Sequence, residues 1–260
     1  MDWSKTKTIF IVTFLLLNIF LGYQLYERNK QGEISVLTDP DLQSRLEEEG
    51  IEIDIEDAEE TVTGAPVTGT SATFDESYLE ENLERQTISL LNPTTVFSEL
   101  DGPFRLVGAN LSATVDAFLQ QHVILGEEYE IAQYNESENF IGLYQTYNGR
   151  KIDEYERENF HLVLHLTEDL EIESYVQTYM EISEQEGREQ DLLSPLKAVE
   201  RLLDGGYLSA NAVIEHSELG YYSLIQPDDN FQVFAPVWRI RVDNEDFFVD
   251  ALNGEIQSIS

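Results

Sequence analysis

The longest apolar run of the sequence lies near its start. Residues 8–26, TIFIVTFLLLNIFLGYQLY, are nineteen residues without a charged side chain. As a helix they span about 28 Å, the hydrocarbon thickness of a bilayer. A cleaved signal peptide is the alternative, but no small-x-small cleavage site follows the run. We therefore expect a short tail over residues 1–7 and an uncleaved transmembrane helix over residues 8–26.

The charges on either side of this run predict its orientation. Lys5, Lys7 and the terminal amine precede it, whereas Arg28 and Lys30 follow it beside the acidic Glu27. Positive charge is retained on the cytoplasmic side of a membrane. The N-terminus is thus expected in the cytoplasm, with a single pass through the cell membrane and the C-terminal region outside the cell.

One polar residue, Asn18, lies close to the midpoint of the predicted span. A side-chain amide without a partner is costly there, and Gly22 one turn later allows close backbone approach. Helical spacing places both on one stripe, which consists of Thr8, Ile11, Leu15, Asn18, Gly22 and Leu25. We interpret Ile11, Leu15, Asn18, Gly22 and Leu25 as a contact face for another transmembrane helix. In the alternative interpretation the amide is tolerated alone, since interhelical hydrogen bonds average only about 0.6 kcal/mol.

The next part of the chain, residues 27–90, is predicted to be a stalk, a short helix and strand, and a linker. Asp39-Pro40 pairs a capping carboxylate with a proline suited to the first helical turn, and Gly50 ends this helix. Alternation over residues 51–55, IEIDI, predicts a half-buried strand. Residues 56–73 are rich in threonine, glycine and acids and are interpreted as a linker or exposed loop.

A helix followed by aromatic and β-branched segments then occurs twice. A short acidic helix over residues 75–85 and a turn-rich passage come first, and Ser112 is the expected cap of the first repeated helix. Ser194-Pro195 opens the second such helix. We predict an α+β fold with two tandem extracytoplasmic units, residues 91–185 and 186–260, each with one helix on an antiparallel sheet. Turns are expected at Asn148-Gly149, residues 228–230 and Asn253-Gly254.

Composition excludes several classes of function. The chain has 51 acidic and 15 basic residues, a formal net charge of -36, and no cysteine. This balance opposes binding to nucleic acids, and the absence of cysteine excludes disulfides, thiol nucleophiles and Cys-ligated metals. With 42% hydrophobic residues, most of the chain should fold.

Candidate catalytic and metal-binding residues do not form a recognisable motif. His161 and His165 lie in a strand-like segment, which separates them by about 13 Å, too far for one metal ion. An EF-hand loop starting at Asp243 has Phe247 at its third ligand position. Carboxylate pairs are too numerous to indicate a glycosidase. We predict a protein that is not an enzyme, with no catalytic residue, no metal site and no cofactor.

The N-terminal residues MDWSKTKTIFIVTFLLLNIFLGYQLYE resemble those of the YycI (WalI) family, and the segments PVWRI and FFVDALNGEI are similar to the closing strands of that family. The resemblance implies a membrane-anchored, noncatalytic regulator that pairs with a YycH-like sister protein. It further implies contact with a WalK-like sensor histidine kinase through transmembrane helices, and thus an effect on cell-wall metabolism. The alternative function is an extracytoplasmic ligand-binding or sensor module for a wall fragment, a peptide or a cation.

Overall fold

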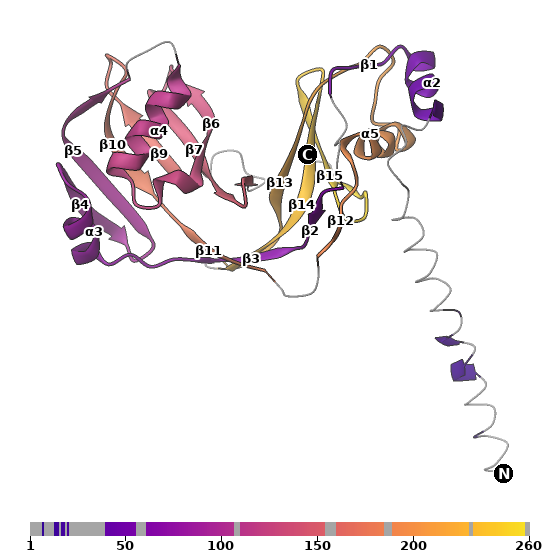
Figure 1. Cartoon of the computed structure of the whole chain (residues 1–260), viewed down its shortest axis with the longest axis horizontal. Helices are drawn as coiled ribbons and strands as arrows, with labels where there is room; N and C mark the ends of the chain where they lie inside the picture. The colour runs from indigo at the N-terminus through magenta and orange to yellow at the C-terminus, as the bar shows by residue number, and fades with distance from the viewer. Residues whose placement is uncertain are drawn as a thin grey trace.

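The computed structural model describes residues 7, 13–15, 17, 18, 20, 40–55, 61–106, 110–153, 160–184, 189–228 and 231–257. These residues form a mixed α+β fold with a large, mostly antiparallel sheet, which confirms the α+β part of the prediction. Figure 1 shows two lobes side by side, which we call the N-lobe and the C-lobe. No helix within the described ranges is both long and apolar enough to cross a membrane. Most of the span predicted over residues 8–26 lies outside the described residues, so the span stays a prediction.

The N-lobe is a six-stranded antiparallel sheet in the order β6-β7-β9-β10-β5-β4. Its elements are α3 (Glu76–Asn82), β4 (Gln86–Asn92), β5 (Thr95–Arg105), α4 (Leu111–His122), the 3-10 helix η1 (Gly126–Glu128), β6 (Tyr129–Asn135), β7 (Phe140–Tyr147), β9 (Leu162–Leu166) and β10 (Glu171–Gln177). Helix α4 covers one face of the sheet, where Phe118 and Leu119 pack in one cluster with Leu143, Leu164 and Tyr175. This cluster is the N-lobe core.

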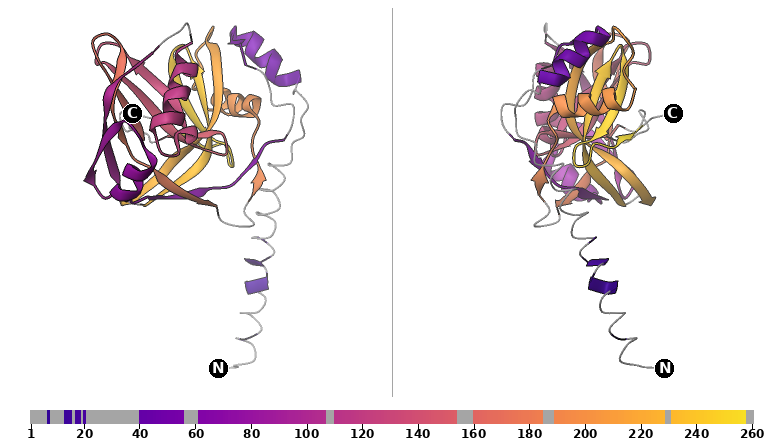
Figure 2. Two further views of the ribbon diagram at one scale, coloured as in Figure 1. Left: turned by 60° about the vertical axis from the view of Figure 1, so that its left-hand side comes forward. Right: turned by 90° about the vertical axis from the view of Figure 1, so that its right-hand side faces the viewer.

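The C-lobe is built around a long hairpin. Its elements are α2 (Pro40–Glu49), β1 (Glu52–Ile53), β2 (Thr63–Gly64), β3 (Val67–Ser71), β8 (Arg150–Asp153), β11 (Met180–Glu184), β12 (Gln190–Asp191), α5 (Pro195–Asp204), β13 (Val213–Asp228), β14 (Phe231–Val242), β15 (Glu245–Asp250) and β16 (Ile256–Gln257). Figure 2 shows α2 and α5 against one side of this sheet. Leu46, Val199 and Leu202 pack there with Ile240 and Val249.

Local signals account for the helix starts and tight turns. Ser194 caps α5 by accepting a hydrogen bond from the Lys197 amide, as expected. The expected cap of α4 is wrong by two residues, because the Asn110 side chain accepts from the Ala113 amide and Ser112 lies inside the helix. Asn148-Gly149 has φ values of 51° and 72°, which suit the two central residues of a hairpin turn.

The sequence interpretation is wrong for two segments. The linker predicted over residues 56–73 contains β3, which lies between β14 and β11, and Gly69 there leaves room for the ring of Phe234. The turn-rich passage is the β4–β5 hairpin. In both cases partners distant in sequence complete the strand, and a local pattern does not contain that information.

The N-lobe and the C-lobe are interleaved along the chain. Strands β3, β8 and β11 belong to the C-lobe sheet although the sequences that encode them flank or interrupt the N-lobe. The chain therefore passes between the lobes several times. Whether residues 91–185 and 186–260 are separate domains stays a prediction.

Burial of His122 at the end of α4 predicts a pH-dependent stability. Its ring stacks on Phe118 with centroids 5.1 Å apart, and burial together with the nearby charge of Arg85 lowers the pKa of His122 below 6.5. Because the pKa of His122 is lower in the folded state, the unfolded state binds a proton at a higher pH than the folded state does. Acidification therefore favours the unfolded state. We expect the free energy of unfolding to fall as the pH drops below about 6.5.

Urea unfolding at several pH values measures this effect. His122→Gln is the reference, since it keeps the backbone carbonyl that accepts from Tyr175 and removes the titrating ring. An identical loss of stability on acidification in parent and variant would contradict the prediction.

Candidate functional site: an anchor stripe and a lobe junction

The predicted contact stripe is only partly within the described residues. Leu15 and Asn18 are helical and exposed, whereas Ile11, Gly22 and Leu25 lie outside the described residues. The apolar neighbours Phe14, Leu15, Leu17 and Phe20 are 62%, 57%, 51% and 57% exposed. Exposed large apolar side chains in such density are typical of a surface that meets lipid or a partner.

A second candidate region is the junction of the two lobes, where β8 pairs with both. It pairs antiparallel with β7 through Lys151 and parallel with β13 through Ile152 and Asp153. Ile152 is fully buried in a small cluster with Val67, Met180, Tyr221 and Phe234. One short strand therefore joins the two sheets.

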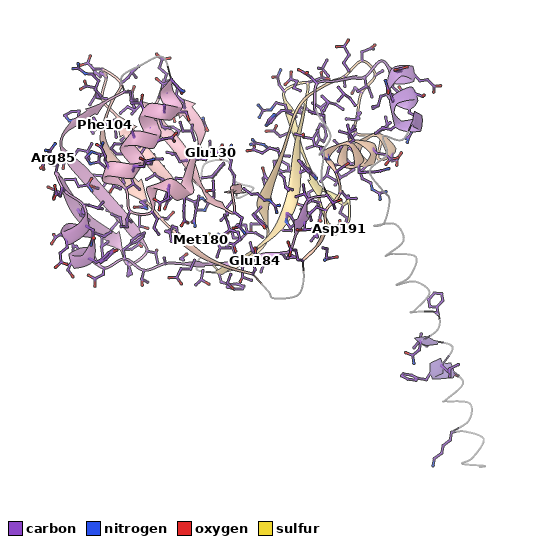
Figure 3. All side chains as sticks on the ribbon, viewed as in Figure 1. Arg85, Phe104, Glu130, Met180, Glu184 and Asp191 are labelled. Carbon is purple, nitrogen blue, oxygen red and sulfur yellow. The ribbon has the colours of Figure 1, made fainter. Side chains whose placement is uncertain are left out.

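A buried amide adds a second link across the junction. The Gln145 side chain on β7 donates to the Met180 carbonyl at 2.9 Å and accepts from the Met180 amide at 2.8 Å. Gln145 is 1% exposed and Met180 is 5% exposed. A doubly hydrogen-bonded amide in such a dry site fixes the start of β11 against the N-lobe. Figure 3 marks Met180 and Glu184 along this strand.

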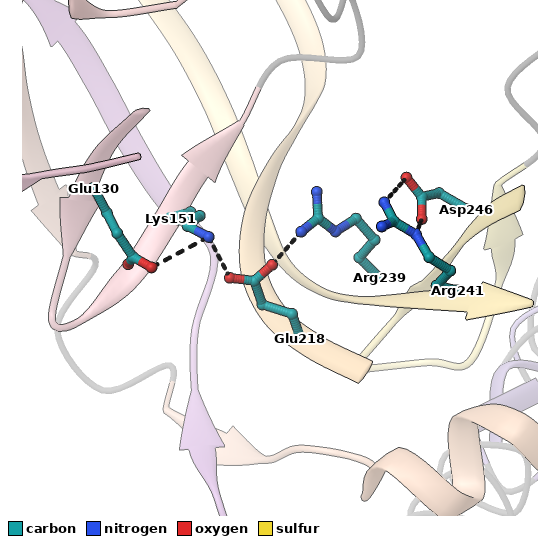
Figure 4. Close-up of polar contacts among 6 residues, drawn as sticks. All are labelled: Glu130, Lys151, Glu218, Arg239, Arg241 and Asp246. Atoms are coloured by element: carbon teal, nitrogen blue, oxygen red, sulfur yellow. Dashed lines mark hydrogen bonds and ion pairs between the residues drawn. The ribbon is translucent and has the colours of Figure 1, made fainter. Parts of the chain in front are cut away.

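Charged side chains form a row across the same junction, shown in Figure 4. The Lys151 ammonium lies 3.3 Å from a Glu130 carboxylate oxygen on β6 and 2.8 Å from a Glu218 carboxylate oxygen on β13. Glu218 also accepts from Arg239 on β14. Burial opposes ionisation of Glu218, but the hydrogen bond and charge of Lys151, with the charge of Arg239, outweigh it and lower the pKa of Glu218. Glu218 therefore stays a carboxylate near neutral pH.

Two further arginines, on β14 and β8, are paired. Arg241 donates twice to Asp246, at 2.9 and 3.1 Å, and this pairing raises the pKa of Arg241. Arg150, beside Lys151, donates to the Thr63 carbonyl at 3.0 Å and lies over the Tyr221 ring. No sequence motif marks Arg150, Lys151 or Arg241. The signal was their scarcity, since few bases stand among many acids outside the first thirty residues and two of them follow the Asn148-Gly149 turn directly.

One of the two histidines considered as metal ligands is buried. His161 is 5% exposed, and its Nδ1 accepts a hydrogen bond from the backbone N–H of Gln145. Within the described ranges, no three His, Asp or Glu side chains are grouped so that they could hold a metal ion. The contacts of the junction link the two lobes.

Comparison with known proteins identifies the family of this chain. A family model described as YycI protein matches residues 29–252. The chain belongs to the YycI family. YycI proteins are membrane-anchored regulatory proteins associated with the WalK/WalR system. The family match begins after the predicted span, so it rests on the lobes.

One solved structure shares the fold at low identity, and a second is similar over part of its length. An uncharacterized protein from Eubacterium rectale ATCC 33656 has a TM-score of 0.50 and 14% identity, over 81% of this chain and 90% of that chain. YycH from Bacillus subtilis has a TM-score of 0.39 and 13% identity, over 70% of this chain and 52% of that one. The search of curated proteins gave no match.

Proposed function

We propose that this YycI protein is a noncatalytic regulatory subunit that, with a YycH-like partner, adjusts a WalK-like sensor histidine kinase through contacts between transmembrane helices. The observation that carries the proposal is the family match over residues 29–252. It is supported at the anchor by Asn18, a polar residue set among the exposed apolar side chains Phe14, Leu15, Leu17 and Phe20. A lipid-embedded amide can gain a hydrogen bond from a polar group on a neighbouring helix.

Regulation requires unequal contact with two states of the kinase. A helix that binds the active and inactive arrangements equally well shifts neither population. A coupling of about 1–3 kcal/mol changes their ratio by about 5- to 150-fold. We assign this difference in contact to one stripe, which consists of Ile11, Leu15, Asn18, Gly22 and Leu25. The lobes would then adjust how strongly the stripe acts on the kinase.

Replacing the anchor tests the proposal against the exterior-sensor alternative. Residues 1–30 are exchanged for an unrelated single-pass anchor of the same orientation, and kinase output is followed with a reporter of its response regulator. We expect regulation to be lost while the lobes remain displayed at the same level outside the cell. Unchanged regulation would reject contact through the anchor and favour the alternative, in which the lobes sense a wall fragment, a peptide or a cation.

A further inference from the structure

We infer that Lys151 acts as an electrostatic latch that holds the N-lobe and C-lobe in one relative arrangement. The bridge consists of one ammonium group between Glu130 of the N-lobe and Glu218 of the C-lobe. Lys151 itself lies on β8, the strand shared by the two sheets. The inference concerns the described lobes and does not depend on the proposed function.

The bridge differs from an ordinary surface ion pair in its burial. The side chain of Lys151 is 16% exposed and that of Glu218 is 24% exposed, so solvent and salt screen this pair weakly. Glu130 is 57% exposed and reaches the ammonium from β6. Figure 4 shows the three side chains converging from three strands, with Arg239 on the far side of Glu218. Arg239 neutralises Glu218 from within the C-lobe, whereas Lys151 joins the lobes.

The charge of the protein makes the loss of this ammonium costly. Without it, Glu130 and Glu218 would face each other across the junction within a strongly acidic chain. Like charges repel, and removal of the ammonium would leave Glu130 without this partner and Glu218 with Arg239 alone. The pairing of β8 with β13 extends over only two residues, Ile152 and Asp153. Repulsion between Glu130 and Glu218 in the absence of the ammonium would therefore act beside the short pairing of β8 with β13.

A spin-label distance between the lobes tests the latch in the full chain in nanodiscs. The chain has no cysteine, so Ser112→Cys on α4 and Ser209→Cys in the C-lobe, both exposed, provide two unique labelling sites. We expect one narrow distance distribution in the parent and a broader, shifted distribution in Lys151→Met. Lys197→Met is the matched control, because it makes the same substitution at a lysine that pairs with Glu200 inside α5. That control is expected to keep the parental distribution.

Glu130→Gln keeps the test decisive if Lys151→Met does not fold. This substitution removes only the exposed N-lobe carboxylate and leaves Lys151 paired with Glu218. It is expected to broaden the distribution, by less than Lys151→Met does, because the link to the N-lobe is lost without any repulsion between carboxylates. A parental distribution in Glu130→Gln, or in a folded Lys151→Met, would overturn the latch. An equal shift in Lys197→Met would do the same, since the effect would then follow from the charge change alone.

Discussion

Asn18→Leu combined with Gly22→Leu will reduce co-purification of the WalK-like kinase with the full chain. Leucine removes the amide that would bond across the interface and the gap that admits another backbone. If the contact contributes about 1–3 kcal/mol, the amount of kinase recovered will fall by about 5- to 150-fold. The measurement is quantitative pull-down from solubilised membranes of cells that express both proteins.

The control for this prediction uses the opposite face of the same helix. Thr13→Leu combined with Phe20→Leu changes two residues about half a turn away from the stripe. This pair should leave recovery of the kinase at the parental level, and neither pair should change the unfolding of the lobes. Equal losses in both double variants would indicate a general defect of the anchor, and no loss in Asn18→Leu with Gly22→Leu would refute the stripe.

Gly126→Ala is expected to cause a large loss of stability in the N-lobe. A Cβ atom at this position would lie 2.2 Å from the carbonyl oxygen of Leu119 and 2.6 Å from its carbonyl carbon. Backbone atoms of α4 cannot move aside as a flexible side chain can, so we expect a cost of about 3 kcal/mol, the upper end for overpacking. Urea unfolding followed by near-ultraviolet circular dichroism, to which the buried Tyr129 and Tyr175 contribute, will report the loss.

Gly102→Ala is the matched substitution. A Cβ atom there has no neighbour within 4 Å, so the variant should be as stable as the parent. In a Trp3→Phe background, Trp238 fluorescence reports the C-lobe in the same experiment, because its indole nitrogen donates to the Leu193 carbonyl beside α5. A shared transition in both signals would mean that the lobes unfold together. A Gly126→Ala variant as stable as Gly102→Ala would contradict the close contact between Gly126 and the backbone of Leu119.

Local chemistry made much of the fold predictable. Pro40 and Pro195 mark the first residues of two helices, and Asn148-Gly149 forms the expected turn. The aromatic and β-branched segments expected after the second helix include the long β13–β14 hairpin, whose register shifts near Ser223. Interleaving of the lobes was not predictable, since the pairing of β3 with β14 joins residues more than 150 positions apart. Such contacts are set by packing that a local pattern does not encode.

One part of the candidate site could be predicted from the sequence and the other could not. The stripe around Asn18 follows from helical spacing alone, because a polar residue in an apolar span stands out in the sequence. The junction does not, since Lys151 and Glu218 belong to strands that only the folded chain brings together. Scarcity of bases could have directed attention to Arg150 and Lys151, but their partners could not have been named among so many acids.

Crosslinking from position 18 in living cells tests the central claim most directly. A photoreactive phenylalanine analogue replaces Asn18 in the full chain, and captured proteins are identified by mass spectrometry after irradiation. The account predicts capture of the WalK-like kinase or the YycH-like partner from position 18 and much weaker capture from position 13 on the opposite face. Equal capture from both positions, or a mature protein found outside the cell without its first thirty residues, would contradict it.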